Sequence, residues 1–331
     1  MTTPTPPSNS TKPANPSSPR PSHFWTIPAP LKRLFDKFPL VTYGDSGLPG
    51  GGVHERGQSS GDGNGEKGGV RGEKEDALHA FFSWTDDVEG DGRVASFNPG
   101  CLRWQAYLTF RGIKFHVVPS NNHASFPSTL PLVASHPDAG PPFVQPVIPA
   151  ASLEKWARKS EPAGMREDVY MSLVEGPIRR AWLYHMYLTP NFELLTLPSY
   201  INSQSKTSLI RAVTSRELRS SAEKALLQYK PVISEHTTYL EAEEAFKSLA
   251  TYLKEQMDNG RPPTTLLDAA VFSYVYLLLE LNEDIWAHKR LVDVVQKFKS
   301  LREHTEVIKK SHFKARPPRL WNSLNAKATG G

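Results

Sequence analysis

The stretch SFNPGCLRWQAYLTFRGIKFHVVPSNNHASFPSTLPLV, residues 96–133, decides the fold class of this chain. Pro99 opens a segment whose apolar residues partly follow helical spacing, and Gly112 ends it. The alternating, β-branched run at 113–118 predicts a strand. The run TLPLVAS at 129–135 predicts another. Helix, strand and strand in this order predict part of a small mixed α/β domain.

Neighbouring segments complete that domain, which we expect over residues 76–160. LHAFFSW at 78–84 predicts a strand before the helix, and PFVQPVIP at 142–149 predicts a strand or one arm of a hairpin. SLEKWARKS at 152–160 predicts a short closing helix.

An all-helical domain is predicted over residues 161–312. The run at 264–281 is apolar nearly all round, so it belongs in the middle of the bundle. The other predicted helices are 165–175 and 177–189, broken at Gly176–Pro177, then 207–229, 235–258 and 283–310.

The flanks predict four further segments. Residues 1–23 form a Pro/Ser/Thr-rich disordered tail and 44–75 a Gly-rich tether. Residues 24–43 are apolar enough to dock, either on their own domain or on a partner. Residues 313–331 form a basic tail. The predicted anchors of the docking segment are Trp25, Leu31, Leu34 and Phe35.

Composition excludes several classes. The formal charge of +5 comes without a basic cluster, which argues against nucleic acid as a partner. One cysteine excludes an internal disulfide and argues against zinc. No apolar run is long enough to span a bilayer. The sequence contains no phosphate-binding glycine loop, metal-binding histidine spacing or nucleophile elbow, so we expect no metal and no cofactor.

Thr265 and Asp268 have the spacing of a helix capping box, at the start of the apolar segment 264–281. In a capping box the hydroxyl and the carboxylate accept hydrogen bonds from exposed backbone N–H groups. That role explains Asp268 fully, so we assign both residues to structure and not to catalysis.

A thioredoxin-like half with Leu130–Pro131, followed by a helical half with a capped apolar helix, resembles the glutathione transferase fold. The predicted class is therefore α+β and glutathione-transferase-like. The resemblance implies that Pro131, which matches the proline beside that family's substrate groove, is cis. It also implies a weakened glutathione pocket, because Ala151 precedes Ser152 where the family carries an acidic residue or Gln.

Cys101 has two interpretations. A helix N-terminus and the nearby Arg103 would favour a reactive thiolate, making the chain an active glutathione transferase-like thiol enzyme. A free cysteine is also among the most buried residue types, and no second cysteine is present to resolve a mixed disulfide. The second interpretation leaves the chain without catalysis.

A closer resemblance is to the metaxin family, specifically to the smaller receptor subunit of the fungal mitochondrial sorting and assembly machinery. The residues that carry it are PLKRLFDKFPLVTY at 30–43, SFNPGCLRWQAYLTFRGIKFHVVPSNNHAS at 96–125 with LPLV at 130–133, and PPTTLLDAAVFSYV at 262–275. The long Gly-rich insert at 44–75 departs from the family's compact spacing.

The resemblance implies a noncatalytic subunit that is peripheral to the mitochondrial outer membrane, on its cytosolic face. Its implied partners are an Omp85-type β-barrel core subunit, a second metaxin-like subunit and β-barrel precursors, received through their terminal-strand signal. The basic tail adds a charge-based attraction to anionic lipid.

A groove for peptide or partner contact is one hypothesis for the residues around the helix start: Asn98, Cys101, Asn121, Asn122 and Pro131. An extended precursor segment would add as a strand beside Pro131. The alternative is that 121–125 is a turn rich in turn-forming residues and that Pro131 only shapes the fold. Loop composition favours this alternative.

Overall fold

The computed structural model describes residues 76–82, 94–120, 130–135, 147–158, 165–202, 207–280 and 285–313. These residues all belong to one compact unit. The predicted tail 1–23, docking segment 24–43 with its four anchors, tether 44–75 and nearly all of the basic tail 313–331 lie outside the described residues.

The described strands form one mixed sheet in the order β2-β1-β3-β4. β1 pairs in parallel with β2 and antiparallel with β3, and β3 pairs antiparallel with β4. Opposite Leu78 lie Val117 on one side and Val133 on the other, and all three are buried. The bounds are β1 Asp76–Ala80, β2 Phe115–Pro119, β3 Leu132–Ala134 and β4 Val147–Pro149.

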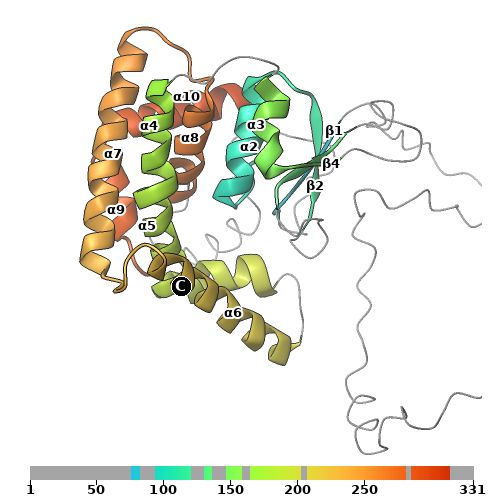
Figure 1. The fold of residues 1–331 in the computed structure, drawn as a ribbon, viewed down its shortest axis with the longest axis vertical. Helices are drawn as coiled ribbons and strands as arrows, with labels where there is room; N and C mark the ends of the chain where they lie inside the picture. Colours follow the sequence, from blue (N-terminus) through green and yellow to red (C-terminus); the bar gives the residue numbers. More distant parts are fainter. Residues whose placement is uncertain are drawn as a thin grey trace, which may run out of the picture. The chain divides into compact units, whose positions relative to one another are not determined.

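Two helices belong to this part, α2 (Pro99–Phe110) and α3 (Ala150–Arg158). Figure 1 shows both on the same side of the sheet, and α2 lies between the sheet and the helical part, against α8. Gly112 follows α2 with φ of 66°, a left-handed conformation that glycine adopts without strain and that ends the helix.

The second half of the described chain is helical. Its elements are α4 Met165–Leu173, η3 Val174–Ile178, α5 Arg179–Leu183, η4 Tyr184–Leu188, η5 Phe192–Asn202, α6 Ser208–Leu227, α7 Glu235–Asp258, α8 Leu266–Leu279, α9 Arg290–Gln296 and α10 Lys299–His312, where η marks π-helix. α8 is buried almost all round, as predicted, and packs against α2, α4, α9 and α10.

Two sequence-based predictions in this half are wrong. The chain does not break at Gly176–Pro177, because the wider π-helical turn η3 accommodates Pro177, which has no N–H to donate. The predicted helix 283–310 is two helices, α9 and α10, because the backbone becomes extended at Phe298.

Thr265 and Asp268 form the capping box of α8. The Thr265 hydroxyl accepts from the Asp268 N–H at 3.2 Å, and Asp268 Oδ2 accepts from the Thr265 N–H at 2.9 Å. Asp268 Oδ1 lies 3.0 Å from Nε2 of the buried His304. Burial raises the Asp268 pKa, but the hydrogen bonds from His304 and Thr265 outweigh it, so the pKa is lowered overall.

Candidate functional site

The N-terminus of α2 is closed by its own residues. Asn98 is the N-cap in extended conformation, and its Oδ1 accepts from the Cys101 N–H at 3.1 Å. Pro99 occupies the first helical position, where a missing N–H costs nothing. One of the backbone N–H groups at the helix start, that of Cys101, is therefore already hydrogen-bonded to the capping side chain.

Cys101 lies beneath this cap. The side chain is 0% exposed, and burial raises the thiol pKa to about 12, although contacts with the Phe81 carbonyl and the Ser96 hydroxyl act in the opposite direction. At neutral pH the sulfur is therefore protonated and sealed from solvent. The geometry gives Cys101 a packing role and offers no support for the thiolate interpretation.

Tyr200, from η5, covers the same helix start. Its hydroxyl accepts from Asn98 Nδ2 at 2.9 Å, and its ring packs edge-on against Phe97 and Phe81 at centroid distances of 4.9 and 5.4 Å. Burial raises the Tyr200 pKa well above its ordinary value. Sequence reasoning missed Tyr200, because nothing local in Phe192–Asn202 indicates a contact with residue 98.

A cleft of about 340 Å³ adjoins this helix start. The Arg103 guanidinium lies 2.9 Å from a Glu175 carboxylate oxygen across it, while Arg179 is exposed and forms no ion pair with any described residue. Burial raises the pKa of Tyr274 to about 12. The lining residues are Pro99, Gly100, Arg103, Val174, Glu175, Arg179, Tyr229 and Tyr274.

This cleft is suited to binding and poorly suited to nucleophilic chemistry. Its lining contains no cysteine, serine or histidine, and the phenol of Tyr274 stays protonated at neutral pH. Two arginines, a carboxylate and two tyrosines can hydrogen-bond polar groups of a partner.

The predicted groove residues separate into three groups. Asn98 and Cys101 meet at the helix cap, and both ends of the Asn98 amide are already hydrogen-bonded. Pro131 is buried and follows a cis peptide bond. Asn121 and Asn122 lie outside the described residues.

A strand added beside Pro131 could not continue along the residues that follow it. The strand that follows, β3, pairs with β1 along one side and with β4 along the other. No edge of Leu132–Ala134 is left open, because β3 is an inner strand of the sheet. Residues 121–129, which precede Leu130 and Pro131, lie outside the described residues, so strand addition at Pro131 itself stays a prediction.

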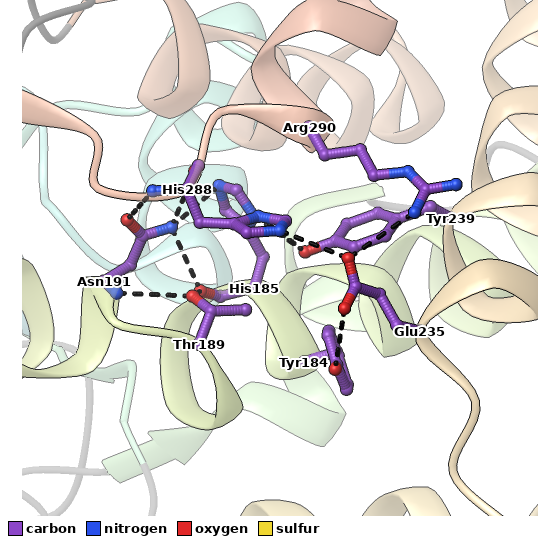
Figure 2. A network of polar contacts seen from close by, with 8 residues as sticks. All are labelled: Tyr184, His185, Thr189, Asn191, Glu235, Tyr239, His288 and Arg290. Atoms are coloured by element: carbon purple, nitrogen blue, oxygen red, sulfur yellow. Dashed lines mark hydrogen bonds and ion pairs between the residues drawn. The ribbon is translucent and has the colours of Figure 1, made fainter.

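A polar network links η4, α7 and the segment before α9 (Figure 2). Asn191 Nδ2 lies 3.2 Å from His185 Nε2, His185 Nδ1 lies 3.0 Å from the Tyr239 hydroxyl, and that hydroxyl lies 3.4 Å from His288 Nδ1. His288 Nε2 then lies 3.2 Å from Glu235 Oε1.

The Asn191 amide joins several of these groups at once. Its Nδ2 carries two N–H groups and also lies 3.2 Å from the His185 carbonyl and 3.0 Å from the His288 carbonyl, while its Oδ1 accepts from the His288 N–H at 3.0 Å. Burial, and secondarily the nearby His288, lower the His185 pKa to about 3, so His185 is neutral at physiological pH. The network joins η4, α7 and the segment before α9, with His185 buried at its centre and Glu235 at the surface.

Among the described residues, no cluster of three or more histidine, cysteine or acidic side chains can hold a metal ion. Within the same ranges, no helix is both long enough and apolar enough to cross a membrane.

The comparisons with known proteins agree with this architecture. A family model for the glutathione S-transferase N-terminal domain matches residues 99–192, from α2 through η4 to the first residue of η5. The chain has a glutathione-transferase-like fold, with a thioredoxin-like mixed sheet followed by a mostly helical part. This confirms the predicted fold class. A comparison with curated proteins found no significant match.

Several solved structures are similar to this chain. Glutathione S-transferase III in its apo form is 10% identical, with a TM-score of 0.39, and the match covers 76% of this chain and 96% of that one. A glutathione transferase from Phanerochaete chrysosporium is 13% identical, with a TM-score of 0.41, covering 69% and 97%. A beta-etherase from Sphingobium sp. strain SYK-6 is 13% identical, with a TM-score of 0.41, covering 76% and 99%.

Proposed function

We propose that this protein is a noncatalytic binding subunit of the β-barrel sorting and assembly machinery of the mitochondrial outer membrane. It is peripheral, on the cytosolic face, next to an Omp85-type barrel subunit and a second metaxin-like subunit. There it helps receive β-barrel precursors and promotes their insertion. The choice of complex is supported by the resemblance of segments 30–43, 96–125 with 130–133, and 262–275 to the metaxin family.

The burial of Cys101 is the observation that carries the noncatalytic part of this proposal. A thiol enzyme needs a solvent-facing sulfur with a depressed pKa. Here the sulfur is 0% exposed, with a pKa raised to about 12. At pH 7 such a thiol is ionised in roughly one molecule in 10⁵.

An exposed apolar surface on α6 supports a role within a complex. Leu209, Ile210 and Val213 are 62%, 46% and 51% exposed, and helical spacing puts them on the side away from the buried Ala222 and Leu226. Neighbouring exposed aliphatic side chains are typical of a surface that a partner covers.

Affinity isolation from mitochondria tests the proposal. The tagged full chain should recover the Omp85-type barrel subunit together with the second metaxin-like subunit. Cys101→Ala should recover both equally well, since the proposed role uses no thiol. Isolation of the folded chain without any barrel subunit would overturn the proposal.

The rival function is a glutathione transferase-like thiol enzyme, and the fold itself is what favours it. Passage over immobilised glutathione separates the two. We expect no specific retention of the wild-type chain and no transferase activity that Cys101→Ala removes. Retention on glutathione, with activity lost in Cys101→Ala, would establish the rival instead.

A further inference from the structure

We propose that the outer edge of β2 is a docking site for an extended polypeptide strand. Its partner, an assignment that rests on the proposed function, is the terminal strand of an unfolded β-barrel precursor. β2 is the first strand in the order β2-β1-β3-β4, so only β1 pairs with it among the described strands. An unpaired edge presents backbone N–H and C=O groups to an incoming strand.

The direction of these groups follows from one hydrogen bond. The Ser120 N–H donates to the Ala80 carbonyl at 2.9 Å, so residue 120 faces β1. Backbone groups alternate sides along a strand, and the register pairs Ala77 with His116 and His79 with Val118. His116 and Val118 therefore also face β1, while Phe115, Val117 and Pro119 face outward.

The open part of the edge has defined ends. The next outward position toward the N-terminus is Ile113, whose N–H already donates to the Leu108 carbonyl at 3.1 Å. At the other end Pro119 has no N–H. Phe115 and Val117 remain, each offering one donor and one acceptor outward. These two residues are separated by His116, which matches the two-residue repeat with which a β-strand presents its backbone groups to one side.

The side chains hold this short edge rigid. Val117 is 2% exposed in the core, and Phe115 packs against the same core. A preorganised edge binds with less ordering cost than a flexible one. The opposite edge of the sheet, β4, spans three residues, ends in Pro149 and continues directly into α3, so it offers less backbone.

A window of two residues supports brief binding and not permanent pairing. At most two donors and two acceptors engage, and each such hydrogen bond makes a small net contribution in water. Reversible binding is what a receptor needs when it must pass its cargo on to a membrane-embedded partner.

Backbone-methylated peptides test the edge on the unmodified full-length protein. The probe is a labelled synthetic peptide carrying the last strand of a mitochondrial outer-membrane β-barrel protein, with binding followed by fluorescence anisotropy. Three further versions are N-methylated at alternate residues along one edge, along the other edge, or along both. Methylation removes the N–H donors of the treated edge.

Strand addition uses one edge of the peptide. At least one singly methylated peptide should therefore bind like the unmodified one, whereas the doubly methylated peptide should bind at least about tenfold more weakly. Equal binding of the doubly methylated peptide would overturn the proposal. So would loss of binding by both singly methylated peptides, because a peptide held along both edges is not added to a sheet edge.

Val117→Pro tests the protein side. It removes one outward N–H and leaves the bonds to β1 in place, while Val117→Ala controls for lost packing. We expect Val117→Pro to bind the peptide about three- to tenfold more weakly than Val117→Ala. Equal affinities in the two folded variants would overturn the docking site. If Val117→Pro does not fold, the methylated peptides decide alone.

Co-isolation with the barrel subunit separates the two proposals. Val117→Pro should still recover the barrel. If the wild-type chain recovers no barrel but discriminates among the peptides, the proposed function fails and the edge site stands. If it recovers the barrel but does not discriminate, only the edge site fails.

Discussion

Tyr200 and Asn98 lie 102 residues apart in the sequence, and a hydrogen bond of 2.9 Å joins their side chains. Through this bond η5 closes the start of α2, the place where a thiol-dependent relative of this fold would need access. Asn98 serves two partners at once, because its other amide atom caps the helix at Cys101.

Tyr200→Phe removes the hydroxyl and leaves the Asn98 amide without its acceptor. We expect the free energy of unfolding to fall by about 1 to 3 kcal/mol, the cost of an unsatisfied polar group in a protected site. Urea denaturation measures it. Tyr184→Phe is the matched control, since the Tyr184 hydroxyl makes only an exposed contact of 3.5 Å with Glu235. An equal loss in both variants would contradict this role of Tyr200.

Cys101 should resist thiol reagents in the native protein. With its pKa raised to about 12 and its side chain buried, reaction with Ellman's reagent at pH 8 should be at least about a hundredfold slower than in the denatured chain. Absorbance of the released thiolate gives both rates. Similar rates before and after unfolding would show that the sulfur is accessible and would revive the enzymatic interpretation.

His185 should make the fold sensitive to acid. The His185 pKa is about 3 in the folded state, against 6.5 ordinarily. Below pH 6.5, His185 therefore binds a proton in the unfolded chain but stays neutral in the native state. Stability therefore rises with pH across this window and falls on acidification. From pH 7 to pH 5 the loss due to His185 is about 2 kcal/mol.

The measurement compares unfolding free energies at pH 7 and pH 5 in the wild type and in His185→Gln. The wild type should lose about 2 kcal/mol more than the variant over this interval. His236→Gln, at an exposed position on α7, should behave like the wild type. A slope unchanged in His185→Gln would refute the prediction.

Asp268 should matter more for stability than Thr265. Thr265→Ala removes one cap acceptor and should cost about 1 kcal/mol. Asp268→Ala leaves the Thr264 and Thr265 N–H groups and the buried His304 ring without their common acceptor. We expect a loss of about 3 to 5 kcal/mol by thermal or urea unfolding. Comparable losses in the two variants would mean that the His304 contact contributes little.

Elements with strong local signals could be predicted from the sequence. α7 was predicted at 235–258 and has these bounds, because Ser234 caps it and its apolar residues form one clean stripe. The proline, the glycine and the apolar spacing at 99–112 fixed α2 in the same way. The all-apolar run at α8 indicated a central helix, and burial agrees.

Long-range and irregular features could not be predicted. The π-helix η5 contains Pro198, which argues against a regular helix, so the segment gave no helical signal. The contact of Tyr200 with Asn98 follows only from the packing of η5. Strand order, which makes β3 an inner strand, is likewise not a local property of the sequence.

The π-helical turn η3 has a consequence for chain length. The Arg179 N–H bonds to the Val174 carbonyl, five residues back, so this turn holds one residue more than an α-helical turn. Losing a single residue here would restore ordinary winding and keep α4 and α5 in phase with each other. The loss of one residue within α7 would rotate the rest of that helix by about 100° about its axis. The apolar side chains beyond the deletion would then no longer face the bundle. Single-residue deletions among natural variants of this protein should therefore collect in Val174–Ile178 and spare Glu235–Asp258.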